Sequence, residues 1–286
     1  MTIGQNAFMT KAILLAAAAA LAGPAAAWAE PADTYYERAF VVAADARCGL
    51  FAPAVDAALT AATAQARGAA LRSGAAEADL KAVAARARFR AETVSCRDPQ
   101  LATVRERVDG AFSGWIRTPR MIFPGAERAW IADRTAWTRP GWRLMQASTV
   151  GASPVKFGYG ESDAAALTAV VSFVGRSRPN AARIVFRDEA RAPHAWLSGS
   201  GLAPASSRAS VWATGVSPAD PALLAEGRRA GEAWRFPGWA ADRLARLDPR
   251  ETFLVEFHFR DGSVASARFE AGDFAAGRAF MAMGAL

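Results

Sequence analysis

Apolar side chains recur at three- and four-residue intervals between residues 34 and 118, the spacing that gathers them on one face of an α-helix. The first stripe begins at Tyr36 and ends at Cys48-Gly49, where glycine favours a helix stop. The later stripes have recognisable boundaries at Pro53, Ser73-Gly74, Glu77 with Asp79, and Asp98-Pro99. The pattern predicts about four alanine-rich helices in residues 30–118.

Beyond residue 119 the pattern changes to short apolar runs that are separated by turn residues, which is typical of strands. The strand candidates are 166–175, 181–188, 210–216, 232–236 and 253–260. A short helix is expected within 238–249, ending before Pro249, and a last helix after Asp273, which we expect to cap it. This part of the chain is therefore predicted to be a β-rich region with a C-terminal helix.

The stretch FLVEFHFRDG places Glu256, His258 and Arg260 at alternate positions, so that on a strand these side chains share one face. With a two-residue turn, Val255 would face Arg268 across the hairpin. A three-residue loop instead makes one face wholly apolar, which favours that register. The pairs it predicts are Phe253 with Phe269, Val255 with Ala267, Phe257 with Ala265, Glu256 with Ser266, and His258 with Val264. We expect the row of Glu256 and His258 to be a solvated hairpin face rather than a catalytic row.

Residues 1–29 have the layout of a secretory signal peptide. Lys11 precedes a short apolar run over 12–23, and Ala27-Trp28-Ala29 forms a cleavage site before Glu30. A membrane anchor is the alternative, but this run is well short of the roughly 20 residues that a spanning helix needs. The sequence therefore predicts a periplasmic or secreted protein of a Gram-negative bacterium, with no transmembrane segment after signal removal.

Export leads to an oxidising compartment, where cysteines pair. The two cysteines, Cys48 and Cys96, are therefore expected to form a disulfide, which in the chain-entropy model stabilises the fold by about 4 kcal/mol. The predicted fold is α+β, with an N-terminal disulfide-tied helical bundle followed by a mostly antiparallel β-sandwich-like region with short helices. Its parts are the signal peptide (1–29), the helical region (30–118) and the β-rich region (119–286).

The chain carries a formal net charge of +7, and almost all of its basic residues are arginine. The lysines are Lys11, Lys81 and Lys156, and loss of the first with the signal peptide leaves about +6. Arginine binds carboxylate and phosphate groups better than lysine does, which favours an acidic partner. A GC-rich codon bias would give the same composition, and the sequence leaves both interpretations open.

Candidate catalytic residues are few, because the chain has only two histidines. His194 follows Asp188 and Glu189 in a loop-like stretch, but no nucleophile stands beside it. Ser153 and Lys156 match the Ser-x-x-Lys motif of penicillin-binding proteins, yet the companion motifs are missing and the flanking residues favour a loop. The sequence contains no phosphate loop, dinucleotide fingerprint or calcium loop, so we predict no catalytic residue, metal site or cofactor.

Residues 115–143 interleave tryptophan with arginine, two side chains that are enriched at interaction surfaces. Trp130 and Trp137 would share one face if this stretch were helical. The candidate surface consists of Trp130, Arg134, Trp137, Arg139, Trp142 and Arg143. Alternatively, the tryptophans fill the seam between the two regions and the arginines are solvated. Nucleic acid fits poorly as a partner, because the protein is predicted to be exported and no nucleic-acid-binding signature occurs.

Residues 255–283 contain a hairpin with a glycine turn, followed by Gly-Asp-Phe-Ala-Ala and a closing helix. This layout resembles the C-terminal part of the invasion-associated locus B family of exported bacterial proteins. That family typically carries cysteines in its strand region, where this chain has none. It has no motif-defined catalytic residues, so the resemblance assigns no site. Over its whole length the chain is similar to uncharacterised exported proteins of GC-rich Gram-negative bacteria.

These patterns lead us to expect a non-catalytic soluble periplasmic or secreted interaction protein that binds an acidic cell-envelope component or a protein partner. The alternative is a cell-envelope hydrolase whose active site is assembled from residues distant in the sequence. A deep pocket with convergent polar groups would favour the hydrolase, whereas an exposed aromatic–basic patch would favour the interaction protein.

Overall fold

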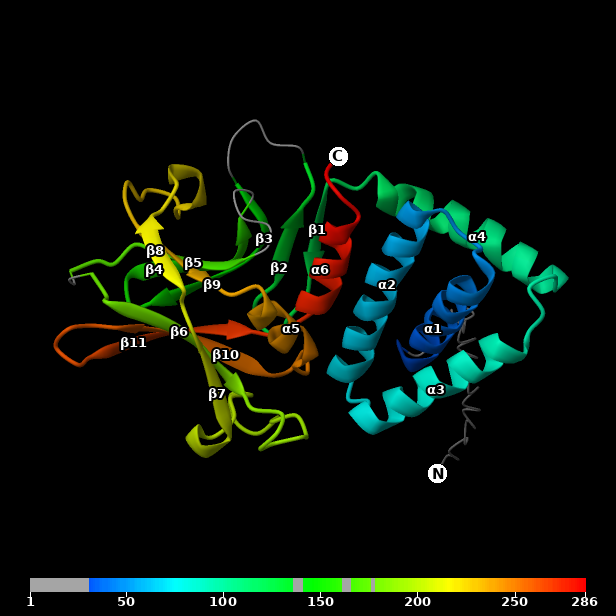
Figure 1. Cartoon of the computed structure of the whole chain (residues 1–286), viewed down its shortest axis with the longest axis horizontal. Helices are drawn as coiled ribbons and strands as arrows, with labels where there is room; N and C mark the ends of the chain where they lie inside the picture. Colours follow the sequence, from blue (N-terminus) through cyan, green and yellow to red (C-terminus); the bar gives the residue numbers. More distant parts are fainter. Residues whose placement is uncertain (1–30, 136–140, 161–165, 176–177) are drawn as a thin grey trace, which may run out of the picture.

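The computed structural model describes residues 31–135, 141–160, 166–175 and 178–286. The expected signal peptide and two residues of the candidate surface, Trp137 and Arg139, lie outside these ranges. The described chain has a helical part and a β-rich part that lie side by side, which confirms the predicted α+β fold (Figure 1). Among the described residues, none of the helices has the length and apolar composition needed to span a bilayer.

The helical part has the predicted number of helices and boundaries close to those expected. Its helices are α1 (Pro31–Cys48), α2 (Pro53–Arg72), α3 (Glu77–Thr93) and α4 (Pro99–Ile116). Gly49 follows α1 with a φ of 61°, a left-handed conformation that glycine adopts without a steric cost. Asp98 caps α4, because its carboxylate accepts a hydrogen bond from the Gln100 N–H at 2.8 Å.

The predicted disulfide is present between Cys48, at the end of α1, and Cys96, just beyond α3, with a Cα–Cα distance of 5.5 Å. It links two helices that pack closely on each other. The apolar contacts among α1–α4 form three separate small clusters built largely from alanine, leucine and valine. The disulfide therefore joins two helices whose apolar contacts are divided between small clusters.

The β-rich part consists of two antiparallel sheets. The seven-stranded sheet contains, in spatial order, β1 (Arg120–Phe123), β2 (Trp130–Asp133), β3 (Trp142–Val150), β4 (Ser153–Gly160), β5 (Leu167–Val171), β9 (Glu232–Phe236) and β8 (Gly215–Pro218). The four-stranded sheet contains β11 (Val264–Glu270), β10 (Thr252–His258), β6 (Ala181–Arg187) and β7 (Arg208–Trp212) in that order. The predicted three-residue-loop register of the β10–β11 hairpin is confirmed at every predicted pair.

The stretch 210–216 was expected to be one strand, and this prediction is wrong. Its residues belong to β7 and β8, which lie in different sheets. The Ala213 N–H donates to Ala182 of the four-stranded sheet, whereas the Thr214 N–H donates to Arg235 of the seven-stranded sheet. Apolar residues lie on both sides of the point where the chain changes sheets, so the hydrophobic pattern alone does not reveal the break.

The main core lies between the two sheets and is rich in phenylalanine. Phe157 of β4 is at its centre, with ring centroids 5.3 Å from Phe253 and 5.4 Å from Phe269, both on the four-stranded sheet. Both residues belong to the apolar face that the hairpin register predicted. The same cluster reaches Ala61 of α2, so the helical and β-rich parts share one core.

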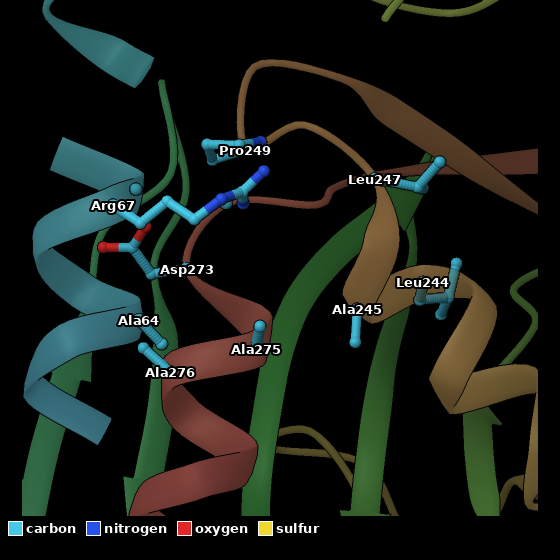
Figure 2. Close-up of a pocket in the computed structure, with 11 residues that line it drawn as sticks. Ala64, Arg67, Leu244, Ala245, Leu247, Pro249, Asp273, Ala275 and Ala276 are labelled. Carbon is cyan, nitrogen blue, oxygen red and sulfur yellow. The ribbon is translucent and has the colours of Figure 1, made fainter. Parts of the chain in front are cut away.

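The joint between the two parts is formed by α2, α5 (Trp239–Arg246) and α6 (Phe274–Ala282). Figure 2 shows the narrow crevice between them, whose lining includes Ala64 of α2, Leu244 of α5 and Asp273 at the start of α6. Asp273 occupies the predicted N-cap position of α6, but its side chain makes no capping hydrogen bond. The buried carboxylate instead forms an ion pair with Arg72 of α2. Gly68 permits this approach, since a Cβ there would collide with the carboxylate.

Candidate interaction surface

Trp130 of the predicted surface is fully buried, so it cannot contribute to an interaction surface. It lies on β2, a strand rather than a helix, where its side chain faces the core. The indole N–H donates to the backbone oxygens of Glu270 and Ala271, at 3.1 and 3.0 Å, and the ring packs against Phe274. Trp130 is thus an interior residue, but it packs beside Phe157 and Phe274 in the main core rather than in a seam between the two regions.

Arg134 is also buried, contrary to its predicted place on a surface. Its guanidinium donates hydrogen bonds to Gly284 O at 2.7 Å, Met283 O at 3.3 Å and Ile116 O at 3.2 Å. Burial lowers the pKa of Arg134, and the nearby charge of Arg143 lowers it further. Arg134 therefore ties the carbonyl ends of α4 and α6 together and is unavailable to a partner.

The remaining described residues of the predicted surface, Trp142 and Arg143, are half-buried. The Trp142 indole donates to Leu223 O at 2.9 Å, and the Lys156 ammonium donates to Leu224 O at 2.8 Å. Both bonds hold the segment 219–231 over the outer face of the seven-stranded sheet, which is therefore partly covered. Arg143 donates to Thr135 O at 2.6 Å. The described part of 115–143 thus does not assemble into the expected tryptophan–arginine surface.

An aromatic–basic surface occurs instead on the outer face of the four-stranded sheet. The strand registers align Ser266, Glu256, Arg183 and Trp212 in one row across β11, β10, β6 and β7. A neighbouring row contains Arg268, Leu254, Val185 and Ser210, and a third contains Val264, His258 and Ala181. We call these residues the outer face. Its most prominent member is Trp212, whose side chain is 49% exposed although it is large and apolar.

The polar groups around Trp212 hold one another in place. The Arg183 guanidinium lies 5.2 Å from the centroid of the Trp212 ring and donates from Nε to Glu256 Oε2 at 2.7 Å. The His258 ring lies 5.1 Å from the same indole, on the next row. These contacts fix the indole and orient the guanidinium by a cation–π contact and a charge-assisted hydrogen bond.

The predicted solvation of Glu256 is wrong, since this residue is only 9% exposed. Arg183 of the adjacent strand β6 forms an ion pair with it, and Trp212 of β7 packs on the guanidinium of Arg183. The sequence showed that Glu256 and His258 share a face, but not which strands adjoin that face. Trp212 and Arg183 were missed for the same reason, because each lies in a short strand whose neighbours are distant in the sequence.

The other chemical candidates from the sequence do not come together. His194 is exposed in the segment between β6 and β7. Ser153 and Lys156 lie on β4 rather than in a loop, and their odd spacing places them on opposite faces of the strand. The Ser153 hydroxyl accepts a hydrogen bond from the Val174 N–H at 3.0 Å. Within the described ranges, no group of three or more acidic, histidine or cysteine side chains could hold a metal ion.

Comparison of the chain with protein-family models, with curated proteins and with solved structures finds no match. The outer face is therefore interpreted from its own geometry alone.

Proposed function

We propose that this chain is an exported interaction protein whose outer face binds an acidic glycan of the cell envelope. The observation that carries the proposal is the half-exposed Trp212 held between Arg183 and His258. The disulfide Cys48–Cys96 is compatible with a location outside the cytoplasm.

The chemistry of the outer face supports a sugar polymer with negative charges. The indole of Trp212 offers a rigid, flat apolar surface to the C–H face of a sugar ring. Arg183, Arg208 and Arg268 are at least partly exposed on the outer side of the sheet, whereas Arg187, Glu256 and Glu270 on the same side are buried. The guanidinium groups of Arg183, Arg208 and Arg268 can donate paired hydrogen bonds to carboxylate or phosphate substituents of the glycan. The surrounding hydroxyls of Ser210 and Ser266 add neutral polar contacts.

Co-sedimentation of the protein purified after export tests this proposal. The binding partners are peptidoglycan, outer-membrane vesicles and anionic liposomes, each across a salt series. We expect binding to the glycan-bearing fractions that weakens as salt rises, because part of the attraction is between exposed charges. The Trp212→Ala variant should lose roughly tenfold or more in affinity, as is common when a central aromatic anchor is removed.

The matched control is Trp239→Ala, which removes a tryptophan that is 55% exposed on α5, away from the outer face. It should bind as the unaltered protein does. Equal binding by Trp212→Ala and the unaltered protein would refute the outer face as the site. Binding to liposomes but not to peptidoglycan would replace the glycan with a lipid surface.

A further inference from the structure

A second feature of the β-rich part lies at one end of the sandwich, where the ends of β5 and β9 leave an open hollow of about 200 Å³. Its lining includes Val171, Ser172, Phe173, Arg178, Gly231 and Glu232. This volume is smaller than that of drug-sized ligand sites but is sufficient for a molecule of about the size of benzene. Phe173 forms a fixed apolar wall, because its ring packs edge-on against Phe257 at 5.3 Å and Phe259 at 5.2 Å.

Glu232 places a carboxylate at the inner side of this end of the sandwich. On β9 it shares a face with Trp234 and Phe236, which belong to the core between the sheets. It is thus the last residue of an inward-facing row, and its side chain is only 14% exposed. Among the described residues that line the hollow, it is the sole carboxylate. Burial raises the pKa of Glu232, an effect that Arg178 and the Trp234 indole partly offset.

The hydrogen-bonding capacity of this carboxylate is only partly used. Its Oε1 lies 3.4 Å from the Nε of Arg178, whose side chain is 86% exposed and reaches it from solvent. The indole of Trp234 stabilises the charged carboxylate, yet neither its Nε1 nor Glu232 Oε2 has a well-formed hydrogen bond within the described part of the chain. A buried carboxylate oxygen without a donor is unfavourable and uncommon in folded proteins.

We propose that the hollow binds a small molecule that carries a protonated amine on a compact apolar body. The ammonium group takes the place of the exposed Arg178 guanidinium beside Glu232 Oε1, and the apolar body lies against Phe173 and Val171. A cation fits because a carboxylate only accepts hydrogen bonds, and the low exposure of Glu232 strengthens a charge pair there. An anion would meet this buried negative charge. The site is on the inner side of the sandwich, so it does not depend on the proposed glycan binding.

Indole ¹H–¹⁵N NMR spectra of the full protein test the proposal, with benzylammonium as the probe. The signal of Trp234, identified by its absence in Trp234→Phe, should shift and saturate as benzylammonium is added. Benzyl alcohol, which has the same ring without the charge, should bind at least roughly tenfold more weakly, because it lacks the ion pair with Glu232. Benzoate should leave the signal unchanged.

Two variants, one at Glu232 and one at an exposed control acid, test whether the Glu232 carboxylate binds the ligand. Glu232→Gln should weaken benzylammonium binding roughly tenfold or more, because the amide carries no charge. Glu226→Gln removes an exposed acid from the segment 219–231 and should leave binding unchanged. The absence of any shift with benzylammonium, or an equal response to benzyl alcohol, would overturn the proposal.

A third variant keeps the test decisive if Glu232→Gln fails to fold. Arg178→Ala removes the exposed guanidinium beside Glu232 Oε1 and leaves the carboxylate in place. Benzylammonium should then bind as tightly as before or more tightly, since a competing cation is gone. A loss of binding in this variant would show that the carboxylate does not direct the ligand.

Discussion

The helical part and the β-rich part of this molecule are stabilised in different ways. The helices pack through three small clusters in which alanine is common, and a disulfide joins the end of α1 to the segment after α3. The sheets enclose one large cluster of phenylalanine side chains contributed by strands far apart in the sequence. Small clusters stabilise a fold weakly, so a covalent link matters most where the apolar core is divided.

The largest expected effect comes from the centre of the phenylalanine core. Phe157→Ala removes a fully buried ring that contacts both sheets, and it should lower the free energy of unfolding by about 3–5 kcal/mol. Urea denaturation followed by circular dichroism measures the change. Phe89→Ala is the control, because Phe89 is exposed on α3 and its removal should change stability little. A loss below about 1 kcal/mol for Phe157→Ala would contradict the central role of this ring.

The next effect distinguishes the two parts of the molecule. Replacing both Cys48 and Cys96 with serine removes the disulfide and should cost about 2–4 kcal/mol. Hydrogen exchange followed residue by residue should show the larger loss of protection in α1 and α3, with β10 retaining most of its protection. An equal loss in α1 and β10 would mean that the two parts unfold as one cooperative unit.

A smaller effect is expected at the joint between the two parts. Gly68→Ala places a methyl group against the Asp273 carboxylate and should destabilise the protein by about 1–3 kcal/mol. Gly110→Ala is the matched control, because Gly110 lies in α4 with open space around it. This control should be neutral or stabilise the helix by up to about 1 kcal/mol. If both variants had the same stability, close packing of α2 against Asp273 would not be required.

The smallest predicted effect concerns pH. Burial alone would raise the pKa of Asp133, but hydrogen bonds from Thr135 and from Arg120 together lower it below the ordinary value. A depressed pKa means that the folded protein holds fewer protons, so Asp133 stabilises the fold above pH 3.8 and this contribution is lost as pH falls further. Because Arg120 is mostly exposed, solvent screening keeps the ion-pair contribution below about 1 kcal/mol.

Thermal melts between neutral and acidic pH measure this contribution. Asp133→Asn should lower the melting temperature near neutral pH and show a weaker loss of stability on acidification than the unaltered protein. Asp109→Asn, which changes an exposed acid on α4, should melt as the unaltered protein does at every pH. If the melting temperature of Asp133→Asn fell as steeply on acidification as that of the unaltered protein, the prediction would be contradicted.

The fold was predicted most accurately where residues close together in the sequence determine the structure. Glycine, proline and a capping aspartate fix the ends of the helices within a few residues, and the Asp261-Gly262 turn together with apolar alternation fixes the register of the last hairpin. The change of sheets after Trp212 escaped prediction because it depends on which strands the two halves pair with. The strands with which they pair, β6 and β9, are not joined to them by a short hairpin, so no local signal identifies the pairing.

The candidate site could not be located from the sequence for a related physical reason. Tryptophan and arginine clustered in the sequence can pack well against other groups. The cluster does not show whether those groups belong to the chain itself or to a binding partner. Trp130 and Arg134 satisfy their hydrogen bonds with backbone oxygens of the chain itself. Trp212 remains available because β7 is an edge strand of the four-stranded sheet, a fact that only the assembled topology shows.

The ion pair between Arg72 and Asp273 joins residues separated by 201 positions. A ribosome makes α2 long before it makes α6, so the helical part is complete while its docking partner does not yet exist. During that interval the face of α2 that will contact α6 has no native cover. Until α6 is made and docks, the helices have only their own small apolar clusters, because the disulfide forms in an oxidising compartment after export.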